Sequence, residues 1–137
     1  MRNDMTIGSL ADQIGLKPET LRYYERLGLI APSGRTESNY RVYDGKAKRR
    51  LQFIRRAQAL GFSLSDIAGL LSLHERPEAD MGEVKQLAER KIAEIEMKIT
   101  DLERMKAGLS ALSQRCPGHG STAGCPILNA LLTEEPE

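Results

Sequence analysis

One apolar stripe runs through a long stretch without proline in the C-terminal half of the chain. Between residues 81 and 115, apolar side chains recur at steps of three or four residues. This spacing places them on one face of a continuous helix, as in the seam of a coiled coil. The stripe consists of Val84, Ala88, Ile92, Ile95, Ile99, Leu102, Met105, Leu109 and Leu112. Because charged residues flank so narrow a stripe, another apolar surface has to cover it.

A second copy of the chain is the partner that this stripe favours. The sequence contains no other stripe of comparable length, so an intramolecular helical hairpin has nothing to pair with. Aromatic residues make up 4% of the 137 residues and tryptophan is absent, which argues against a large globular core. We therefore predict a homodimer that pairs its long helices.

Charge is distributed unevenly along the chain, although its net value is only +1. Residues 1–75 carry 12 Lys and Arg against 8 Asp and Glu, whereas residues 76–137 carry 8 against 11. The N-terminal half is therefore suited to a polyanion such as DNA, and the rest is not. The sequence shows neither a membrane-crossing apolar run nor a signal peptide, so we expect a cytoplasmic protein whose thiols stay reduced.

Two short helical patterns separated by a glycine lie near the N-terminus. Leu10, Ala11 and Ile14 form one apolar stripe, and Gly15 ends it. Pro18 suits the first turn of the next helix. The stripe of this second helix consists of Leu21, Tyr24 and Leu27. Two helices across a tight turn predict a helix-turn-helix, whose second helix would enter the major groove of DNA.

Residues 32–43 change from a helical to a hairpin-like pattern. Turn residues fill the middle of this segment, and the residues from Tyr40 to Tyr43 then alternate at a period of two. The pattern predicts a wing, which is a β-hairpin beside the helix-turn-helix. Arg35 and Arg41 are candidates for phosphate contacts, while Tyr40 and Tyr43 supply packing and hydroxyl groups. The alternative is a solvated hairpin whose arginines only maintain solubility.

Two further helices complete the N-terminal region. Asp44 is a candidate cap for a helix over about residues 45–59, which carries a basic run at residues 46–50. Gly61 interrupts this pattern, and Ser63 starts another helix that continues through Leu73. The core faces of these two helices are predicted to consist of Leu51, Ile54, Ala57, Leu60, Ile67, Leu70 and Leu71.

The only two cysteines of the chain lie in one loop rich in glycine and proline. Cys116 and Cys125 are nine positions apart, with His119 between them. Glycines at positions 118, 120 and 124 allow the backbone to bring both sulfurs toward one point. Two thiolates satisfy a monovalent d¹⁰ ion such as Cu(I), Ag(I) or Au(I), whereas Zn(II) usually takes four ligands. The alternatives are small buried hydrophobic residues, a disulfide, or a thiol enzyme or redox switch that uses Cys116 with His119.

Four motifs in this order resemble the MerR-type metal-responsive transcription regulators. They are Ile7-Gly8-x-Leu10-Ala11, Thr20-Leu21-Arg22-Tyr23-Tyr24-Glu25-x-x-Gly28-Leu29-Ile30, Arg35-Thr36-Glu37-x-x-Tyr40-Arg41-x-Tyr43 and Phe53-Ile54-Arg55-Arg56-Ala57-x-x-Leu60-Gly61-Phe62-Ser63. The resemblance covers nearly the whole chain and implies a mainly α fold. It implies a winged helix-turn-helix DNA-binding domain over residues 5–75, a long antiparallel dimerisation coiled-coil helix over 76–115, and a metal-binding loop with a short helix and tail over 116–137.

The resemblance also implies how the protein acts. A homodimer would bind near-palindromic promoter DNA, and metal binding would make it an activator that distorts the promoter for RNA polymerase. The implied DNA-binding residues are Thr20, Arg22, Tyr24, Arg35, Tyr40, Arg41 and Tyr43. Asn39 departs from the family pattern, which usually has glycine before the wing tyrosine. Because asparagine tolerates a left-handed backbone, we expect the turn to be kept.

Within the family, the sequence Cys-Pro-Gly followed by Cys-Pro-Ile-Leu is similar to the metal loop of the copper-efflux regulators. This resemblance makes Cys116 and Cys125 the ligands of Cu(I), Ag(I) or Au(I). The loop is one residue longer than the copper type and is closer in length to those of zinc, lead and mercury sensors. A Zn(II), Cd(II) or Pb(II) sensor that also uses His119 is therefore the alternative. Met81 stands where copper sensors carry serine, and it is either dimer packing or a further soft ligand. The carboxylates available to a divalent site are Asp80 and Glu83.

Overall fold

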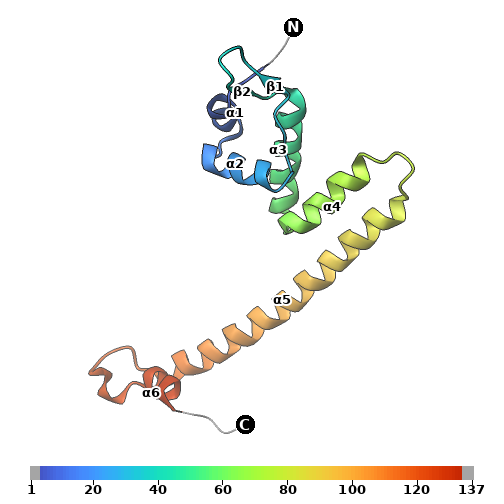
Figure 1. The fold of residues 1–137 in the computed structure, drawn as a ribbon. Helices are drawn as coiled ribbons and strands as arrows, with labels where there is room; N and C mark the ends of the chain where they lie inside the picture. The colour runs from blue at the N-terminus through green and yellow to red at the C-terminus, as the bar shows by residue number, and fades with distance from the viewer. Residues whose placement is uncertain (1–3, 134–137) are drawn as a thin grey trace. The chain divides into compact units, whose positions relative to one another are not determined.

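The computed structural model describes residues 4–133, so residues 1–3 and the predicted tail at 134–137 lie outside the described part. The chain divides into two compact units, Met1–Leu87 and Ala88–Glu137. The elements in chain order are α1 (Ile7–Ile14), α2 (Pro18–Arg26), β1 (Gly34–Arg35), β2 (Arg41–Val42), α3 (Gly45–Ala59), α4 (Leu64–His74), α5 (Met81–Arg115), η1 (Thr122–Gly124) and α6 (Pro126–Leu132) (Figure 1). The fold is therefore mainly helical with a two-stranded wing, as predicted.

The helix-turn-helix forms where the sequence predicts it. α1 begins after Thr6, whose Oγ1 accepts a hydrogen bond from the backbone N–H of Ser9 at 3.2 Å. Gly15 ends α1 with φ +81°, in the left-handed region that glycine adopts without steric cost. α2 begins at Pro18, where the helix needs no backbone N–H donor. Local signals thus define both helices.

An apolar core joins these helices to α3, α4 and the base of the wing. Leu10, Leu21 and Leu51 are fully buried in it, and Tyr43 brings the end of β2 into the same cluster. The other buried members are Ala11, Ile14, Tyr24, Leu29, Ile30, Ala47, Ile54, Ala57, Ile67 and Leu71. Burying one leucine or isoleucine side chain contributes about 1.5–3 kcal/mol. This shared core therefore sets the position of α2 relative to the wing.

The wing is a short antiparallel hairpin. Its paired residues are Gly34 with Val42 and Arg35 with Arg41. Asn39 in the turn has φ +69°, which confirms the expectation that asparagine keeps the left-handed turn. After β2, Tyr43 and Met5 exchange two backbone hydrogen bonds of 2.7 Å. Because two-stranded hairpins are marginally stable alone, the wing needs additional contacts to hold one orientation.

α3 and α4 carry the predicted caps. Two leucines predicted to face the core, one after α3 and one after α2, are instead exposed. Asp44 accepts a hydrogen bond from the backbone N–H of Lys46 at 3.0 Å, and Ser63 forms a capping box at the start of α4. Leu60 is 68% exposed because α3 ends at Ala59 and Leu60 lies beyond the helical stripe. Leu27, the residue after α2, is 48% exposed for the same reason.

α5 is continuous from Met81 to Arg115, which confirms the predicted long helix. The boundary between the two compact units falls within it, whereas the predicted boundaries at 76 and 116 lie near its ends. The exposed members of its stripe are Val84, Ile92, Ile95, Ile99, Leu102, Met105 and Leu109. Such a face is the expected property of a helix that pairs with a second copy. Within residues 4–133, no helix has the length and apolar composition needed to cross a bilayer.

Replacing Ile99 by glutamate is expected to dissociate the predicted dimer, because the seam would have to bury a charge or open. We expect the dimer dissociation constant to rise about a hundredfold, equivalent to about 3 kcal/mol. Sedimentation equilibrium measures this constant. Met97 lies off the stripe and is 69% exposed, so Met97→Glu adds the same charge as a control and should leave the dimer intact. An Ile99→Glu protein that dimerises normally would contradict the prediction.

Candidate nucleic-acid interface and metal loop

α2 and the wing form the walls of a shallow concavity of about 330 Å³. The residues that line it are Thr6, Ile7, Arg22, Arg35, Asn39, Tyr40, Arg41 and Tyr43, and this surface is called the arginine face below. Arg22 comes from α2, Arg35 from β1 and Arg41 from β2, so three arginines from separate elements border one hollow. Guanidinium groups arranged in this way suit phosphate oxygens.

The structure corrects two of the predicted DNA contacts. Tyr24 is only 5% exposed, and its hydroxyl accepts a hydrogen bond from Gln58 Nε2 at 3.3 Å. Tyr43 is fully buried in the core. Tyr24 therefore serves the fold, because the apolar face of α2 turns it inward, whereas Tyr43 packs into the core and also borders the arginine face. Tyr40 is 70% exposed and remains available, whereas Thr20 is half-buried and lies outside the lining of the arginine face.

Tyr23 is the exposed tyrosine of α2, and sequence reasoning missed it. It is 45% exposed, and the guanidinium of Arg26 lies 5.7 Å from the centre of its ring. The signal was present in the sequence, because successive helical residues point about 100° apart. If Leu21 and Tyr24 face the core, Tyr23 points about 100° away from Tyr24 and therefore faces outward.

Glu25 connects α2 to the wing beside the arginine face. Its side chain is 16% exposed and accepts hydrogen bonds from Arg41 Nη1 at 2.5 Å and from the hydroxyl of Tyr43. Burial and, next, the hydrogen bond and charge of Glu25 raise the pKa of Tyr43 to about 12, while Arg41 acts in the opposite direction. Sequence reasoning also missed this residue, because one acidic side chain on a short helix has no pattern that distinguishes it.

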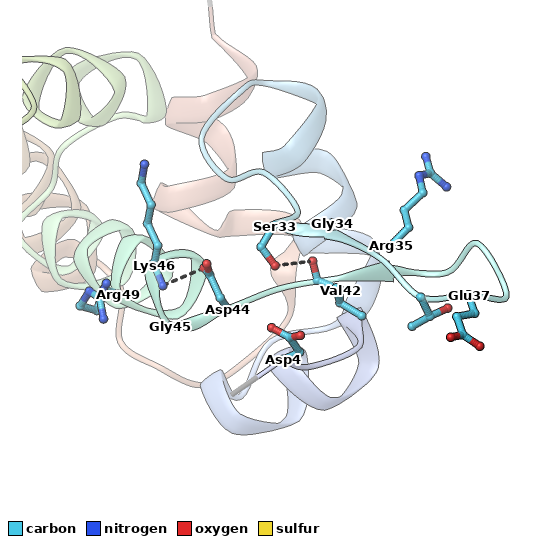
Figure 2. A pocket seen from close by; sticks show the side chains of 11 residues that line it. Asp4, Ser33, Gly34, Arg35, Glu37, Val42, Asp44, Gly45, Lys46 and Arg49 are labelled. Carbon is cyan, nitrogen blue, oxygen red and sulfur yellow. Dashed lines mark hydrogen bonds between the residues drawn. The ribbon is translucent and has the colours of Figure 1, made fainter. Parts of the chain in front are cut away.

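A larger hollow of about 720 Å³ lies at the wing and the start of α3. Figure 2 shows that Arg35, Lys46 and Arg49 point away from one another along its wall. The acidic members of the same lining are Asp4, Glu37 and Asp44. The cationic groups diverge and acidic groups lie among them. The hollow therefore has no point at which several cationic groups could bind one small anion.

Two arginines of the basic helix α3 stabilise the fold itself. Arg50 donates from Nε to the carbonyl oxygen of Leu29 at 2.6 Å and forms an ion pair with Glu75. Arg55 donates to the carbonyl oxygen of Ile14, at the C-terminal end of α1. The excess positive charge of the N-terminal half therefore overstates the number of cations that are free to meet DNA.

The two cysteines flank a loop between α5 and α6. Cys116 directly follows α5, and Cys125 is the N-cap of α6. Both are half-buried free thiols. Gly118 and Gly120 have φ values of +80° and +99°, so two of the three predicted glycines supply the left-handed turns of the loop. The loop encloses a hollow of about 260 Å³ whose lining includes both cysteines.

The first turn of α6 favours the thiolate form of Cys125. The backbone N–H of Leu128 lowers the pKa of this thiol most, burial opposes that effect, and the N–H of Ile127 and the Cys116 thiol lower the pKa further. The N-terminal end of a helix stabilises negative charge in this way. The local structure therefore favours the thiolate, which is the form of a cysteine that can bind a metal.

His119 does not join the cysteines in this structure. Its Nδ1 lies 3.1 Å from the carbonyl oxygen of Pro117 within the loop. In the part of the chain from 4 to 133, no group of three or more His, Cys, Asp or Glu side chains is arranged to hold a metal ion. The other candidate ligands, Met81, Asp80 and Glu83, are exposed at the start of α5. The loop alone therefore offers two sulfurs.

The raised pKa of Tyr43 predicts the response of stability to alkaline pH. With a pKa of about 12 in the folded protein and 10.0 as the reference value, the protonated hydroxyl stabilises the fold fully below pH 10.0. This contribution is lost as the pH rises toward about 12. Tyr43→Phe is expected to cost about 1–2 kcal/mol at neutral pH and to flatten the alkaline decline.

Urea denaturation at a series of pH values measures this difference in the free energy of unfolding. Tyr40→Phe is the control, since Tyr40 is 70% exposed and its loss should leave the profile unchanged. Identical alkaline profiles for the wild type and Tyr43→Phe would refute the assignment.

Two family models match the chain. The model of MerR HTH family regulatory proteins matches residues 5–73, and the model described as MerR, DNA binding matches residues 48–112. The mercuric resistance operon regulatory protein of Bacillus cereus is 44% identical over 92% of this chain and 96% of its own length. The HTH-type transcriptional regulator CueR of Yersinia pestis is 39% identical over 93% of this chain and 91% of its own length.

Solved structures show the same likeness. PbrR691 from Ralstonia metallidurans CH34, in complex with lead(II), superposes with a TM-score of 0.82 at 37% identity, covering 93% of this chain and 98% of that chain. MerR from Bacillus megaterium MB1, in complex with mercury(II), gives a TM-score of 0.68 at 41% identity, covering 94% of this chain and all of that chain. With these matches spanning both units, the chain belongs to the MerR family of DNA-binding helix-turn-helix transcription regulators, whose metal-responsive members are among its relatives.

Proposed function

We propose that the chain is a dimeric transcription activator that senses Cu(I), with Ag(I) and Au(I), through Cys116 and Cys125. The observation that carries this proposal is the pair of free thiols in one loop, where both line a single hollow. Two thiolates suit monovalent d¹⁰ ions of low coordination number, whereas zinc-type ions usually take four ligands. Relatives named CueR are 37% to 39% identical to the chain, and the likeness of the Cys-Pro-Gly and Cys-Pro-Ile-Leu motifs to the copper-efflux regulators supports the proposal.

The residues of the loop fit such an ion. A monovalent thiophilic ion bound to both sulfurs would offset one of the two thiolate charges and hold the loop closed. The amide of Leu128 lowers the pKa of the Cys125 thiol, which reduces the cost of removing its proton when a metal binds. We place this chemistry in the cytosol, where thiols remain reduced.

The arginine face would meet the promoter. Arg22, Arg35 and Arg41 would contact phosphates that fix the position of the protein, and Tyr40 would add a hydroxyl contact. Tyr23 joins this set because of its exposure, and Thr20 remains in it as a residue of α2. A dimer along the α5 stripe would present two such faces to the two halves of a near-palindromic site.

Metal binding would be coupled to DNA shape through α6. The apolar stripe of this helix consists of Ile127, Leu128, Leu131 and Leu132, and its last three members are 44%, 73% and 82% exposed. Ordering the loop from Cys116 to Cys125 would dock this stripe and bias the dimer toward a form that kinks and untwists the promoter for RNA polymerase. Such deformation costs about 1–6 kcal/mol, which many phosphate contacts can offset.

A sensor of Zn(II), Cd(II) or Pb(II) is the second candidate. Its support is the likeness to PbrR691, which was solved with lead(II), at a TM-score of 0.82. In this chain, His119 would leave the carbonyl oxygen of Pro117 to become a third ligand. Met81 is a further soft ligand candidate, and a divalent site also has carboxylates available from Asp80 and Glu83.

Metal titration in competition with chelators separates the two candidates. We expect the reduced protein to prefer Cu(I) to Zn(II), to lose Cu(I) binding in Cys116→Ser and in Cys125→Ser, and to keep it in His119→Ala. X-ray absorption should show two sulfur ligands. A preference for a divalent ion, together with loss of metal binding in His119→Ala, would support the second candidate. Unchanged reporter output in the double serine variant would indicate a constitutive DNA binder, contrary to both.

Changing Leu128 to asparagine tests the coupling through α6. We expect metal affinity to stay nearly intact and the metal-induced increase in transcription to fall at least about fivefold, the lower end of typical coupling free energies. In vitro transcription from the native promoter measures the induction ratio. Asn129→Ser changes the neighbouring exposed residue as a control. An unchanged ratio in the Leu128 variant would exclude this route.

A further inference from the structure

Glu25 is an acidic side chain beside a surface built from arginines. A carboxylate near a phosphate-binding surface weakens DNA binding unless it performs another task. With 16% of its side chain exposed, Glu25 is not a solvated helix charge. It instead accepts hydrogen bonds from two groups of the wing, Arg41 Nη1 and the Tyr43 hydroxyl.

These two contacts hold one strand at two points. Arg41 and Tyr43 are two positions apart in an extended segment, so their side chains project to the same face. Each strand of the wing is two residues long, which leaves the hairpin few backbone hydrogen bonds of its own. The carboxylate of Glu25 therefore adds two contacts between α2 and the wing to those made by the shared core.

Arg41 stays available to DNA while it is held. Its side chain is 49% exposed, and its guanidinium has five N–H donors, of which Glu25 engages only part. A side chain that is already held in place loses less conformational freedom when it binds. The held guanidinium of Arg41 also reaches only the phosphates on the side toward which it points.

We propose that Glu25 is a positioning residue that makes DNA binding selective. By fixing the wing on α2, it sets the spacing between Arg22 and Arg41 to match the phosphates of one DNA geometry. Without this contact, Arg41 can follow the phosphates of any duplex. The inference rests on DNA binding by the family and is independent of the metal that the loop senses.

Glu25→Gln tests the proposal, because it keeps the shape of the side chain and removes its charge. The probes are a duplex enriched by the wild type from a randomised pool and a shuffled duplex of the same composition. Fluorescence anisotropy at one salt concentration gives both dissociation constants. For the enriched duplex, we expect the constant to rise about tenfold to a hundredfold, the range for loss of a charge-assisted contact. The shuffled duplex should bind equally well or more tightly, since its binding depends on net charge.

Two further variants identify the route of the effect. Glu19→Gln makes the same change in the first turn of α2, at an exposed position, and should leave discrimination unchanged. In a double-mutant cycle, Glu25→Gln and Arg41→Ala should be non-additive on the enriched duplex, because Glu25 acts through Arg41. A purely structural role would lower the affinity for both duplexes together.

Equal losses on both duplexes, additive effects in the cycle, or unchanged discrimination would each overturn the proposal. If Glu25→Gln does not fold, Arg41→Lys provides the same test, because it keeps the positive charge and loses the guanidinium fork. It should lose discrimination and retain binding to the shuffled duplex. Unchanged discrimination in Arg41→Lys would be equally decisive against the idea.

Discussion

The shared apolar core of the first unit is the constraint on which the arginine face depends. Leu21 of α2 and Tyr43 at the end of the wing are buried in one cluster, although the two residues lie on separate elements. With Leu21 and Tyr24 turned inward, the helical repeat turns Arg22 and Tyr23 outward. The same packing that excludes water therefore determines which polar groups can meet DNA.

Charged groups in this unit divide into those that hold the fold and those that remain available. Arg50 and Arg55 donate to main-chain carbonyl oxygens, those of Leu29 and Ile14. Glu25 links Arg41 to the core through Tyr43. Arg41 is thus both a structural partner and an exposed cation. Net charge alone does not separate these uses, because it counts each side chain once regardless of its contacts.

The metal loop is organised more locally. Its turns rely on the positive φ values of Gly118 and Gly120, and the first amides of α6 favour the thiolate of Cys125. These features lie within a few residues of Cys116 and Cys125, so the short sequence between α5 and α6 already contains most of the candidate site. The proposed coupling to DNA is different in kind, since it would require the exposed leucines of α6 to dock on another surface.

The helices, their caps, the wing and the cysteine pair could be predicted from the amino-acid sequence, because each arises from neighbouring residues. Gly15 ends α1, Ser63 caps α4, and the repeat of the α5 stripe indicates a helix that needs a partner. The burial of Tyr24 and Tyr43 and the contacts of Glu25 with the wing arise instead from packing between separate elements. The bond from Tyr43 to Glu25 spans 18 residues, and no local pattern specifies a contact that forms only after helix and hairpin pack together.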